Sequence, residues 1–409
     1  MKIDKHLSWK KIFLLIFILN IGWSNSNTFL YARPTKKAKR ARKRVSRPRK
    51  KKQPIRRRRA RRTIRRRQAP QFSSRQIKFS QTISKFFAPS FLEKNPHYVV
   101  WTAKTAIPFT ELILSWNALR PSEGKLTFWI NVQHHGNRWS GWQRLAEWGA
   151  HTQRTFINRR NPYVHTKHVR VEMQKKASGQ AFKVKVAFSG GAESTNLKAL
   201  FACHSNLRKF GLSKPATAKP SVFVEGVPRQ SQKVLDHPRA NDLCSPTSTS
   251  MIVNYFMGKM YGFKCPRMHD YVIDFADKAH DKGMANIYGN WLLNVAQAFD
   301  ASNGDVFYRV ERLNSFNDLY HYLAKKIPVV VSVRKLVGGA SPYRYGHHIV
   351  VVGWNREKQS VVCIDPAFRQ KKSTLKLYKI WHFLRAWARS TNLSYIPLPK
   401  SELWNWLKF

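Results

Sequence analysis

Hydrophobic and polar residues alternate between residues 77 and 200, in short runs that turn residues separate. In Lys125–Val132 and Phe182–Phe188, apolar side chains occupy mostly every second position. Because successive side chains of a strand point to opposite faces, this period predicts strands with one face in water. Regular spacing of such strands favours a β-sandwich, which we assign to residues 76–205. The other runs of this kind are Leu112–Trp116 and Val169–Met173.

The hydrophobic pattern changes after residue 223, first to helical spacing and then to continuous apolar runs. Helices followed by an antiparallel sheet indicate an α+β domain, which we assign to residues 223–409. Residues 206–222 contain Ser, Pro and Ala and would link it to the β-sandwich. The predicted helices lie near His269–Ala279, Trp291–Phe299 and Ser315–Lys326. The predicted strands are Pro328–Val333, Gly346–Gly353 and Ser360–Pro366.

A further helix is predicted directly after Cys244. We expect Ser245 to be its N-cap and Pro246 its first helical residue, because a cap needs a side-chain oxygen and the first amide has no partner to lose. Cys244 would then lie just outside the helix, where the macrodipole and a nearby imidazole lower a thiol pKa from about 8.5. The alternative interpretation is a buried structural cysteine. The apolar face of the helix consists of Met251, Ile252, Tyr255 and Phe256.

The first 75 residues differ in composition from the rest of the chain. Basic residues, an apolar run from Ile12 to Ile21 and small polar residues predict a secretory signal peptide over residues 1–32. An uncleaved membrane anchor is disfavoured, because the apolar run is shorter than the roughly 20 residues of a span. Residues 33–75 form a basic tail, in which residues 33–67 hold 22 Lys and Arg and no Asp or Glu. Such a segment cannot bury enough apolar surface to fold alone, so we expect it to be disordered.

The charge of the chain indicates an anionic partner. The formal net charge is +54, of which +32 remains without the 22 basic residues of the tail. Behind a signal peptide, an anionic cell-envelope polymer or a membrane surface is the favoured partner, and nucleic acid is less favoured. The protein would then be secreted or held in the cell envelope.

The spacing of cysteine and histidine gives no metal site. The chain has no CxxC pair, and His134 and His135 have no carboxylate or cysteine at ligand spacing, so we interpret them as surface residues. If Cys244 is a free nucleophile, at most one disulfide can join the other cysteines, which are Cys203, Cys265 and Cys363.

Three tryptophans lie close together at positions 139, 142 and 148. Exposed tryptophans could stack on sugar rings, whereas buried ones would belong to the core of the β-sandwich. We favour the core for these residues.

The residues of a thiol nucleophile occur in the order Cys244, His347 and Asp365. A thiol enzyme needs a cysteine at a helix N-terminus, an imidazole that takes its proton, and a third side chain that orients the imidazole. His347 and Asp365 fall on consecutive predicted strands that can pair as a hairpin. A glutamine amide ahead of the cysteine would donate to the oxyanion of the tetrahedral intermediate, and both Gln230 and Gln232 precede it.

Two adjacent imidazoles, His347 and His348, are candidates for the base. Successive side chains in a strand point to opposite faces, so we expect only one of them to face Cys244. Each histidine shares its face with apolar residues, so burial does not distinguish them. An interpretation in which both histidines only pack in the core is the alternative.

Four short motifs occur in order along the second domain. They are Ser231-Gln232, Cys244-Ser-Pro-Thr-Ser, Gly346-His347-His348 followed by four apolar residues and Gly353, and Ile364-Asp365-Pro366-Ala367. Together they resemble the secreted relatives of the bacteriocin-leader-processing cysteine peptidases, a papain-like group. The tryptophan-rich β module in front is similar to one found beside such peptidase domains.

The resemblance implies a papain-like fold with Cys244 as nucleophile, His347 as base, Asp365 as its orienting residue and Gln232 as oxyanion donor. His347 is preferred to His348 because it directly follows the glycine of the motif, whereas His348 stands where the relatives carry a large, usually aromatic side chain. Ser245 replaces a glycine of many relatives, a change that concerns substrate range. No metal or organic cofactor is implied.

The expected function is that of an exported thiol hydrolase. It would cleave peptide or isopeptide bonds of a peptide or protein substrate through an acyl-enzyme on Cys244. One alternative is an envelope acyltransferase or amide hydrolase of the same fold. Another alternative, of a different class, is a non-catalytic protein that binds an anionic polymer.

The basic tail gives a prediction of its own. Deletion of residues 33–67 should abolish most of the salt-dependent binding to polyanions, because the release of counterions by the tail's positive charges drives that binding. Turnover of a small substrate should not change. Binding to a polyanion column at increasing salt measures the effect. Full-strength binding of the truncated protein at low salt would assign the binding to the folded domains instead.

Overall fold

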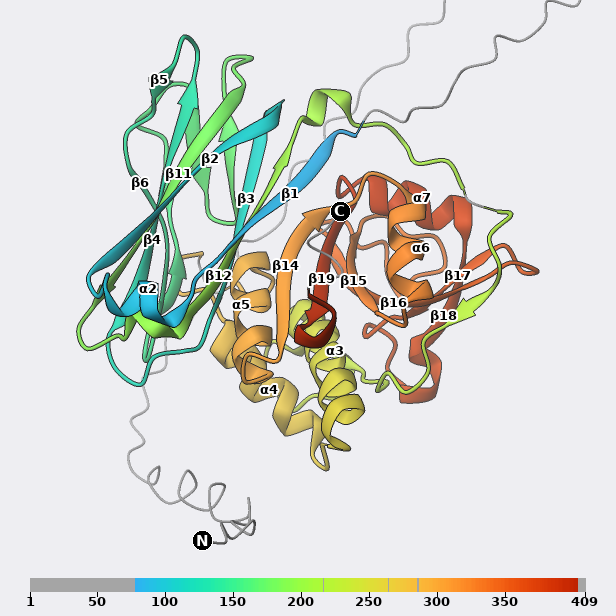
Figure 1. Cartoon of the computed structure of the whole chain (residues 1–409). Helices are drawn as coiled ribbons and strands as arrows, with labels where there is room; N and C mark the ends of the chain where they lie inside the picture. The colour runs from blue at the N-terminus through green and yellow to red at the C-terminus, as the bar shows by residue number, and fades with distance from the viewer. Residues whose placement is uncertain (1–77, 216, 264, 285–286, 404–409) are drawn as a thin grey trace, which may run out of the picture. The chain divides into compact units, whose positions relative to one another are not determined.

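The computed structural model describes residues 78–215, 217–263, 265–284 and 287–403 (Figure 1). All of them belong to the compact unit formed by residues 73–409. The predicted signal peptide and basic tail lie outside the described residues. Within the described part of the chain, no helix is long and apolar enough to cross a membrane.

The first domain consists of two antiparallel sheets. One sheet has the strand order β1-β12-β3-β10-β9-β8, and the other has the order β2-β11-β4-β6-β7, with β5 paired to β4. The two sheets meet where the ring of Trp116 stacks on Phe128, with 4.4 Å between centroids. The elements are β1 (Ser80–Phe86), α2 (Pro89–Glu93), β2 (Tyr98–Phe109), β3 (Glu111–Ala118), β4 (Lys125–His134), β5 (Arg138–Trp139), β6 (Gln143–Gly149), β7 (Gln153–Thr155), β8 (Ile157–Asn158), β9 (Val164–Lys167), β10 (Arg170–Met173), β11 (Gly179–Ser189) and β12 (Leu197–Ser205).

The second domain combines helices with one antiparallel sheet in the order β14-β19-β15-β16-β17-β18, and β13 pairs with β16. The predicted hairpin exists as β16 and β17. Strands β14, β18 and β19 and helix α7 were not predicted from the sequence. The elements are β13 (Val222–Phe223), α3 (Cys244–Tyr261), α4 (Met268–Ala279), α5 (Trp291–Ala301), β14 (Val306–Arg312), α6 (Phe316–Ala324), β15 (Val329–Val333), β16 (His347–Asn355), β17 (Ser360–Ile364), β18 (Leu375–Lys379), α7 (Ile380–Ala388) and β19 (Leu393–Pro399).

Helix α3 is buried on all sides from Ser245 to Phe256, unlike a surface helix with one apolar face. Several of its hydroxyl side chains donate to nearby carbonyls. Thr249 donates to the carbonyl of Ser245 at 2.8 Å, and Ser248 donates to the carbonyl of His348 at 3.0 Å. The second of these bonds ties the first turns of α3 to strand β16.

The expected start of α3 was wrong by two residues. The helix begins at Cys244 itself, and Leu243 occupies the N-cap position without a side-chain cap. A short 3-10 turn leads directly into the helix, so the amide of Thr247 bonds to the carbonyl of Leu243 at 2.9 Å. Ser245 therefore lies inside the first turn, and its hydroxyl contacts the phenol oxygen of Tyr395 at 3.1 Å.

The β domain covers the edge of the second domain's sheet. Strand β14 lies at the end of that sheet, and an uncovered edge strand leaves backbone groups without partners. Asn117 of β3 satisfies both backbone groups of Tyr308, at 2.7 and 2.8 Å, and Ser115 accepts from the amide of Val310 at 2.9 Å. The side chains of β3 thus take the place of a neighbouring strand.

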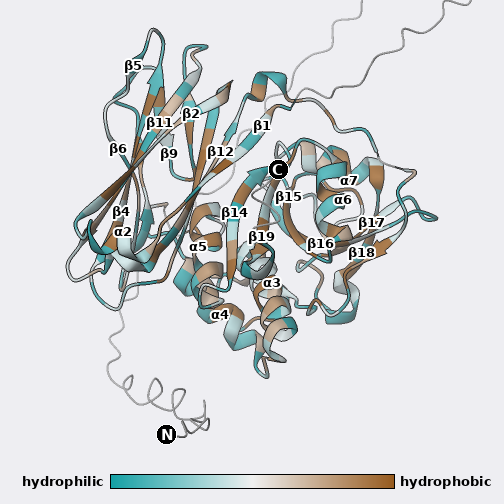
Figure 2. Ribbon diagram, in the orientation of Figure 1, coloured by the Kyte–Doolittle hydropathy of each residue, from teal (hydrophilic) through white to brown (hydrophobic). Residues whose placement is uncertain are grey.

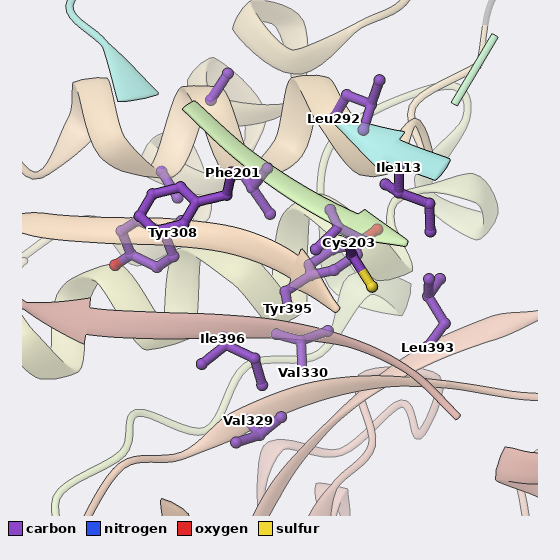
Figure 3. Packing of buried hydrophobic residues seen from close by; sticks show 14 of the residues in the cluster. Ile113, Phe201, Cys203, Leu292, Tyr308, Val329, Val330, Leu393, Tyr395 and Ile396 are labelled. Atoms are coloured by element: carbon purple, nitrogen blue, oxygen red, sulfur yellow. The ribbon is translucent and has the colours of Figure 1, made fainter. Parts of the chain in front are cut away.

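One hydrophobic core continues across the two domains. Phe86 of β1 packs on Phe307 of β14 with 5.6 Å between ring centroids. Figure 3 shows Ile113 and Phe201 of the β domain with Tyr308 and Tyr395, and all four belong to the same buried cluster. Hydrophobic residues colour the strands of both domains, among them β4, β12 and β16 (Figure 2).

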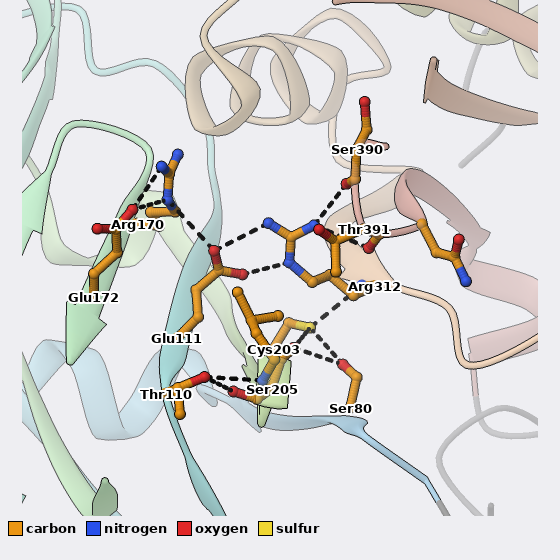
Figure 4. A network of polar contacts seen from close by, with 12 residues as sticks. Ser80, Thr110, Glu111, Arg170, Glu172, Cys203, Ser205, Arg312, Ser390 and Thr391 are labelled. Atoms are coloured by element: carbon orange, nitrogen blue, oxygen red, sulfur yellow. Dashed lines mark hydrogen bonds and ion pairs between the residues drawn. The ribbon is translucent and has the colours of Figure 1, made fainter. Parts of the chain in front are cut away.

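A buried ion pair also joins the domains (Figure 4). Arg312 at the end of β14 forms a two-pronged ion pair with Glu111 of β3 through Nε and Nη2. Its third nitrogen, Nη1, donates to the carbonyls of Ser390 and Thr391 at 2.8 and 2.9 Å. Cys203 accepts from the amide of Arg312 at 3.4 Å. Removing one partner would leave a buried charge without its counter-charge, so loss of either side chain should be strongly destabilising.

The interpretation of the clustered tryptophans was only partly correct. Trp148 is fully buried, but Trp139 is half-buried and Trp142 is 38% exposed. The ammonium of Lys183 lies 4.5 Å from the ring centroid of Trp139, and that of Lys185 lies 5.4 Å from Trp142. These two tryptophans therefore belong to a basic, aromatic outer surface of the β domain.

The interpretation of the two neighbouring histidines was also only partly correct. His135 is exposed, but His134 is buried against the ring of Tyr163, with centroids 5.1 Å apart. His134 is therefore part of the packing of the β domain rather than a surface residue.

Candidate active site

Cys244 lies at the first residue of α3 and is partly exposed. At this position its thiol is next to backbone amides that have no intrahelical partner and to the positive end of the helix dipole. The other three cysteines are also free thiols, and Cys203 and Cys363 are buried. Only Cys244 and Cys265 are therefore reachable from solvent.

The pairing of β16 with β17 brings His347 to Asp365. His347 begins β16, and Asp365 directly follows β17. Nε2 of His347 lies 2.8 Å from Oδ1 of Asp365, which leaves Nδ1 as the ring nitrogen that can interact with the thiol of Cys244. Gly346 precedes the histidine with a φ of 113°, a conformation that favours glycine. The structure thus brings Cys244, His347 and Asp365 together.

Asp365 is fully buried and accepts hydrogen bonds on both oxygens. Besides His347, Oδ1 accepts from the amide of Ala367 at 3.0 Å. Oδ2 accepts from the phenols of Tyr343 and Tyr378 at 2.8 and 2.7 Å. A buried carboxylate with this many donors remains ionised and keeps its orientation.

Tyr343 and Tyr378 were not predicted as site residues. Tyr343 also stacks on the ring of His347, with centroids 4.0 Å apart and planes 20° apart, so it holds the imidazole from its face as well. Tyr343 comes from the loop before β16, and Tyr378 comes from β18. Their only signal in the sequence is a tyrosine on each side of the His347–Asp365 hairpin, which by itself indicates no role.

The thiol and the imidazole shift each other's ionisation. Burial alone would raise the pKa of the Cys244 thiol, but hydrogen bonds and electrostatic interactions with His347 and His348 lower it to about 5. Burial alone would lower the pKa of His347, but Asp365 and the thiol raise it to about 9. Burial would also raise the pKa of Asp365, yet His347 and Tyr378 hold it below its usual value. A thiolate beside an imidazolium is thus the favoured state at neutral pH.

The expectation that only one of the adjacent histidines faces Cys244 was wrong. Nδ1 of His348 lies 3.9 Å from Sγ of Cys244, so both imidazoles interact with the thiol. The alternation of side chains holds within a regular strand, but β16 begins at His347, directly after the unusual backbone of Gly346. Only His347 has a carboxylate partner among the described residues.

Gln232 lies in a 3-10 turn, and its backbone amide bonds to the carbonyl of Pro366, next to Asp365, at 2.9 Å. Its side-chain nitrogen donates to the carbonyls of Ala240 and Asn241 at 3.0 and 2.7 Å, in the turn that leads to Cys244. Gln230 is equally buried, and its backbone amide faces Met251, two turns along α3. Gln232 is therefore tied to the segment before the thiol, while Gln230 contacts the middle of the helix.

A cavity of about 610 Å³ lies at the other end of α3, where Asn254, Gly258 and Phe263 help to line it. None of the four candidate residues is among its lining.

No group of three or more metal-ligating side chains is arranged as a metal site in the part of the chain that the structure describes.

A cysteine at the start of a buried helix, with an imidazole and a carboxylate on paired strands, is the constellation of the papain-like thiol enzymes. The family comparison agrees with this class. Residues 224–395 match the Peptidase_C39 like family, and residues 90–188 match the Peptidase C39 N-terminal domain. The chain therefore carries a C39-like, papain-like cysteine peptidase domain behind a β domain of the kind that precedes it, which confirms the resemblance inferred from the sequence. A peptidase function in general follows from this family.

A C39-like peptidase from Bacillus anthracis is a similar solved structure. It is 15% identical, has a TM-score of 0.32, and the match covers 44% of this chain and 99% of that chain. Comparison with curated proteins gives no match.

The two shifted pKa values predict a window of activity. The thiolate of Cys244 is present above about pH 5, and the imidazolium of His347 is present below about pH 9. We therefore expect the rate of alkylation by iodoacetamide to rise through about pH 5, and peptide turnover to fall above about pH 9. Rates measured between pH 4 and 10 check both limits.

Asp365→Asn is the matched variant for this window, because it removes the charge and keeps the shape. Without the carboxylate, the upper limit should move from about pH 9 toward the ordinary histidine value of about 6.5. An upper limit that stays near pH 9 in this variant would contradict the assignment of Asp365 as the partner that holds the imidazolium.

Proposed function

We propose that the protein is an exported thiol hydrolase that cleaves peptide or isopeptide bonds through an acyl-enzyme on Cys244. The carrying observation is the partly exposed thiol at the start of α3, beside an imidazole that a buried carboxylate holds. The apolar run and basic residues of positions 1–32 support export to the cell surface or the medium.

The chemistry follows from the ion pair. The thiolate of Cys244 attacks the carbonyl carbon of the scissile bond, and the imidazolium of His347 gives its proton to the departing amine. The C–N bond breaks and a thioester remains. A water molecule then gives a proton to His347 and attacks the thioester, and the thiolate leaves as the acid forms. Asp365 stabilises the imidazolium at the start and end of this cycle.

The oxyanion of each tetrahedral intermediate needs donors near the thiol. We assign this role to the backbone amides of the first turn of α3 and to the side-chain amide of Gln232. The position of Gln232 against the carbonyls of Ala240 and Asn241 supports this role, because it keeps the amide at the entrance of the helix. To donate to an oxyanion, the amide must share a hydrogen that it now gives to these carbonyls.

An envelope acyltransferase or amide hydrolase is the enzymatic alternative. The same thioester would react with an amine in place of water, so both reactions use the same residues. Adding a primary amine during turnover distinguishes them. An amide product in place of the acid supports acyl transfer.

Binding of an anionic polymer is a second candidate function, for the β domain and the tail. On the outer surface of the β domain, Lys183 and Lys185 lie over Trp139, Trp142 and Trp129. Neither lysine forms an ion pair with any residue that the structure describes. Binding that survives deletion of the tail would be assigned to this face.

Cys265 is a matched control for the proposed nucleophile. Both cysteines are partly exposed, but burial raises the pKa of the Cys265 thiol, whereas that of Cys244 is lowered to about 5. At pH 6, a thiol-directed probe should therefore label Cys244 selectively. Cys244→Ala should lose this labelling together with all cleavage of a peptide library, as followed by mass spectrometry. Equal labelling of the two thiols, with no cleavage by the unaltered protein, would argue for a non-catalytic protein. Cleavage by Cys244→Ala would show that Cys244 is not the nucleophile.

The oxyanion assignment gives a separate prediction. Gln232→Ala should lower turnover by about 100- to 1000-fold, as for the loss of one oxyanion donor, and leave the thiol pKa of Cys244 unchanged. Gln230→Ala, at an equally buried position, is the control and should leave turnover near that of the unaltered protein. A changed thiol pKa in Gln232→Ala would show that the residue positions the loop before Cys244 instead.

A further inference from the structure

A second imidazole lies against the thiol, and the reaction as derived above does not use it. Nδ1 of His348 is 3.9 Å from Sγ of Cys244, and the side chain is buried. Its other ring nitrogen, Nε2, lies 3.1 Å from the phenol oxygen of Tyr395 on β19. The same phenol oxygen lies 3.1 Å from the hydroxyl of Ser245, the residue after the nucleophile. A chain of contacts thus runs from Sγ through His348 and Tyr395 back to the first turn of α3.

One arrangement of the hydrogens in this chain makes His348 a donor to the thiol. Burial raises the pKa of Tyr395, so its phenol keeps its proton and is able to donate. The hydroxyl of Ser245 can donate to the phenol oxygen, and the phenol can then donate to Nε2 of His348. An imidazole that accepts at Nε2 carries its hydrogen on Nδ1, the atom nearest Sγ.

The surroundings of His348 differ from those of His347. Among the described residues, His348 forms no ion pair and no hydrogen bond with a carboxylate, whereas His347 is held by Asp365. The titratable groups around it are Cys244 from α3, Tyr395 from β19, and the neighbouring His347 of β16 with Asp365 behind it. On β15, the residue opposite His348 is Ser332, which does not titrate. Within the part of the chain that the structure describes, the phenol of Tyr395 is the side-chain group that contacts Nε2 of His348.

We propose that His348 is a second, neutral imidazole of the active site that donates a hydrogen bond from Nδ1 to the thiolate of Cys244, with Tyr395 and Ser245 as its positioning residues. This inference rests on the proposed function, in which Cys244 is the nucleophile. No proton is transferred: the donor stabilises the negative sulfur in the resting enzyme and again when the thiolate leaves the tetrahedral intermediate of deacylation. The thiolate is then held by one charged and one neutral imidazole.

The test measures the thiol pKa of Cys244 from the rate of iodoacetamide alkylation against pH, with no peptide substrate present. His348→Phe removes the donor and should raise this pKa by about one unit, the lower range for a hydrogen bond to a charged group. His348→Asn keeps an N–H at the position of Nδ1 but cannot titrate, so it should retain most of the low thiol pKa. If His348→Asn behaves like His348→Phe, or if His348→Phe leaves the pKa unchanged, the proposal is overturned.

Tyr395→Phe tests the positioning role, because it deletes only the hydroxyl. It should raise the thiol pKa by a few tenths of a unit when His348 is present, and should have no effect in the His348→Phe background, as expected for residues that act through one another. Tyr308→Phe is the matched control, since the Tyr308 phenol is also buried but has no hydrogen-bond partner among the described residues. An equal shift by Tyr395→Phe in both backgrounds would overturn the role of Tyr395.

Measuring peptide cleavage together with the thiol pKa separates this inference from the proposed function. Thermal unfolding of each variant confirms that alkylation is measured on folded protein. A thiol pKa that depends on His348 in a protein that cleaves no peptide would overturn the peptidase function and support the inference. Peptide cleavage with a thiol pKa that is independent of His348 would support the peptidase function and overturn the inference.

Discussion

The buried carboxylate of Asp365 is the constraint on which the active-site geometry depends. A carboxylate without water is costly to bury, and here the cost is offset by donors from separate parts of the fold: the imidazole of His347, the amide of Ala367, and two phenols. Tyr378 comes from β18 and Tyr343 from the loop before β16, so the carboxylate draws together the strands on both sides of β17. Because these donors fix the orientation of the carboxylate, the carboxylate in turn fixes the orientation of the His347 imidazole.

The active-site geometry also requires a helix that approaches the sheet closely while its first turn carries polar side chains. The hydroxyl side chains of Ser245, Ser248 and Thr249 meet this requirement, because each contacts a nearby carbonyl or phenol without the bulk of a larger residue. The sheet itself depends on the β domain, whose Asn117 and Ser115 cover the edge strand β14. Strand β14 pairs with β19, and β19 carries Tyr395 to the active site. The β domain is thus structurally continuous with the strands that shape the site.

The sequence predicted part of this fold and much of the site. Alternating and helical periods located β3, β4, β10 and β11 of the β domain and the helices α3 to α6, and the order Cys244, His347, Asp365 identified the residues that the structure brings together. Strands β14 and β19 were missed, since their apolar runs are interrupted by polar or proline residues whose role depends on the neighbouring strands. The tyrosines around Asp365 could not be predicted either, because a phenol becomes a donor to a carboxylate only through packing between elements far apart in sequence.

Two of the wrong expectations, those on Ser245 and His348, have a common physical origin. Ser245 was expected to cap the helix, and His348 was expected to point away from the thiol, and both expectations applied a local rule to a residue at the end of an element. At the ends of α3 and β16, the local rule competes with hydrogen bonds to a third element.

That third element is β19, where the phenol of Tyr395 contacts both Ser245 and His348. Without the phenol, the Ser245 hydroxyl and Nε2 of His348 would each be a buried polar atom that has lost this partner, which is costly, so the identities of the three residues are mutually dependent. Three side chains far apart along the sequence therefore form one hydrogen-bonded unit behind the nucleophile.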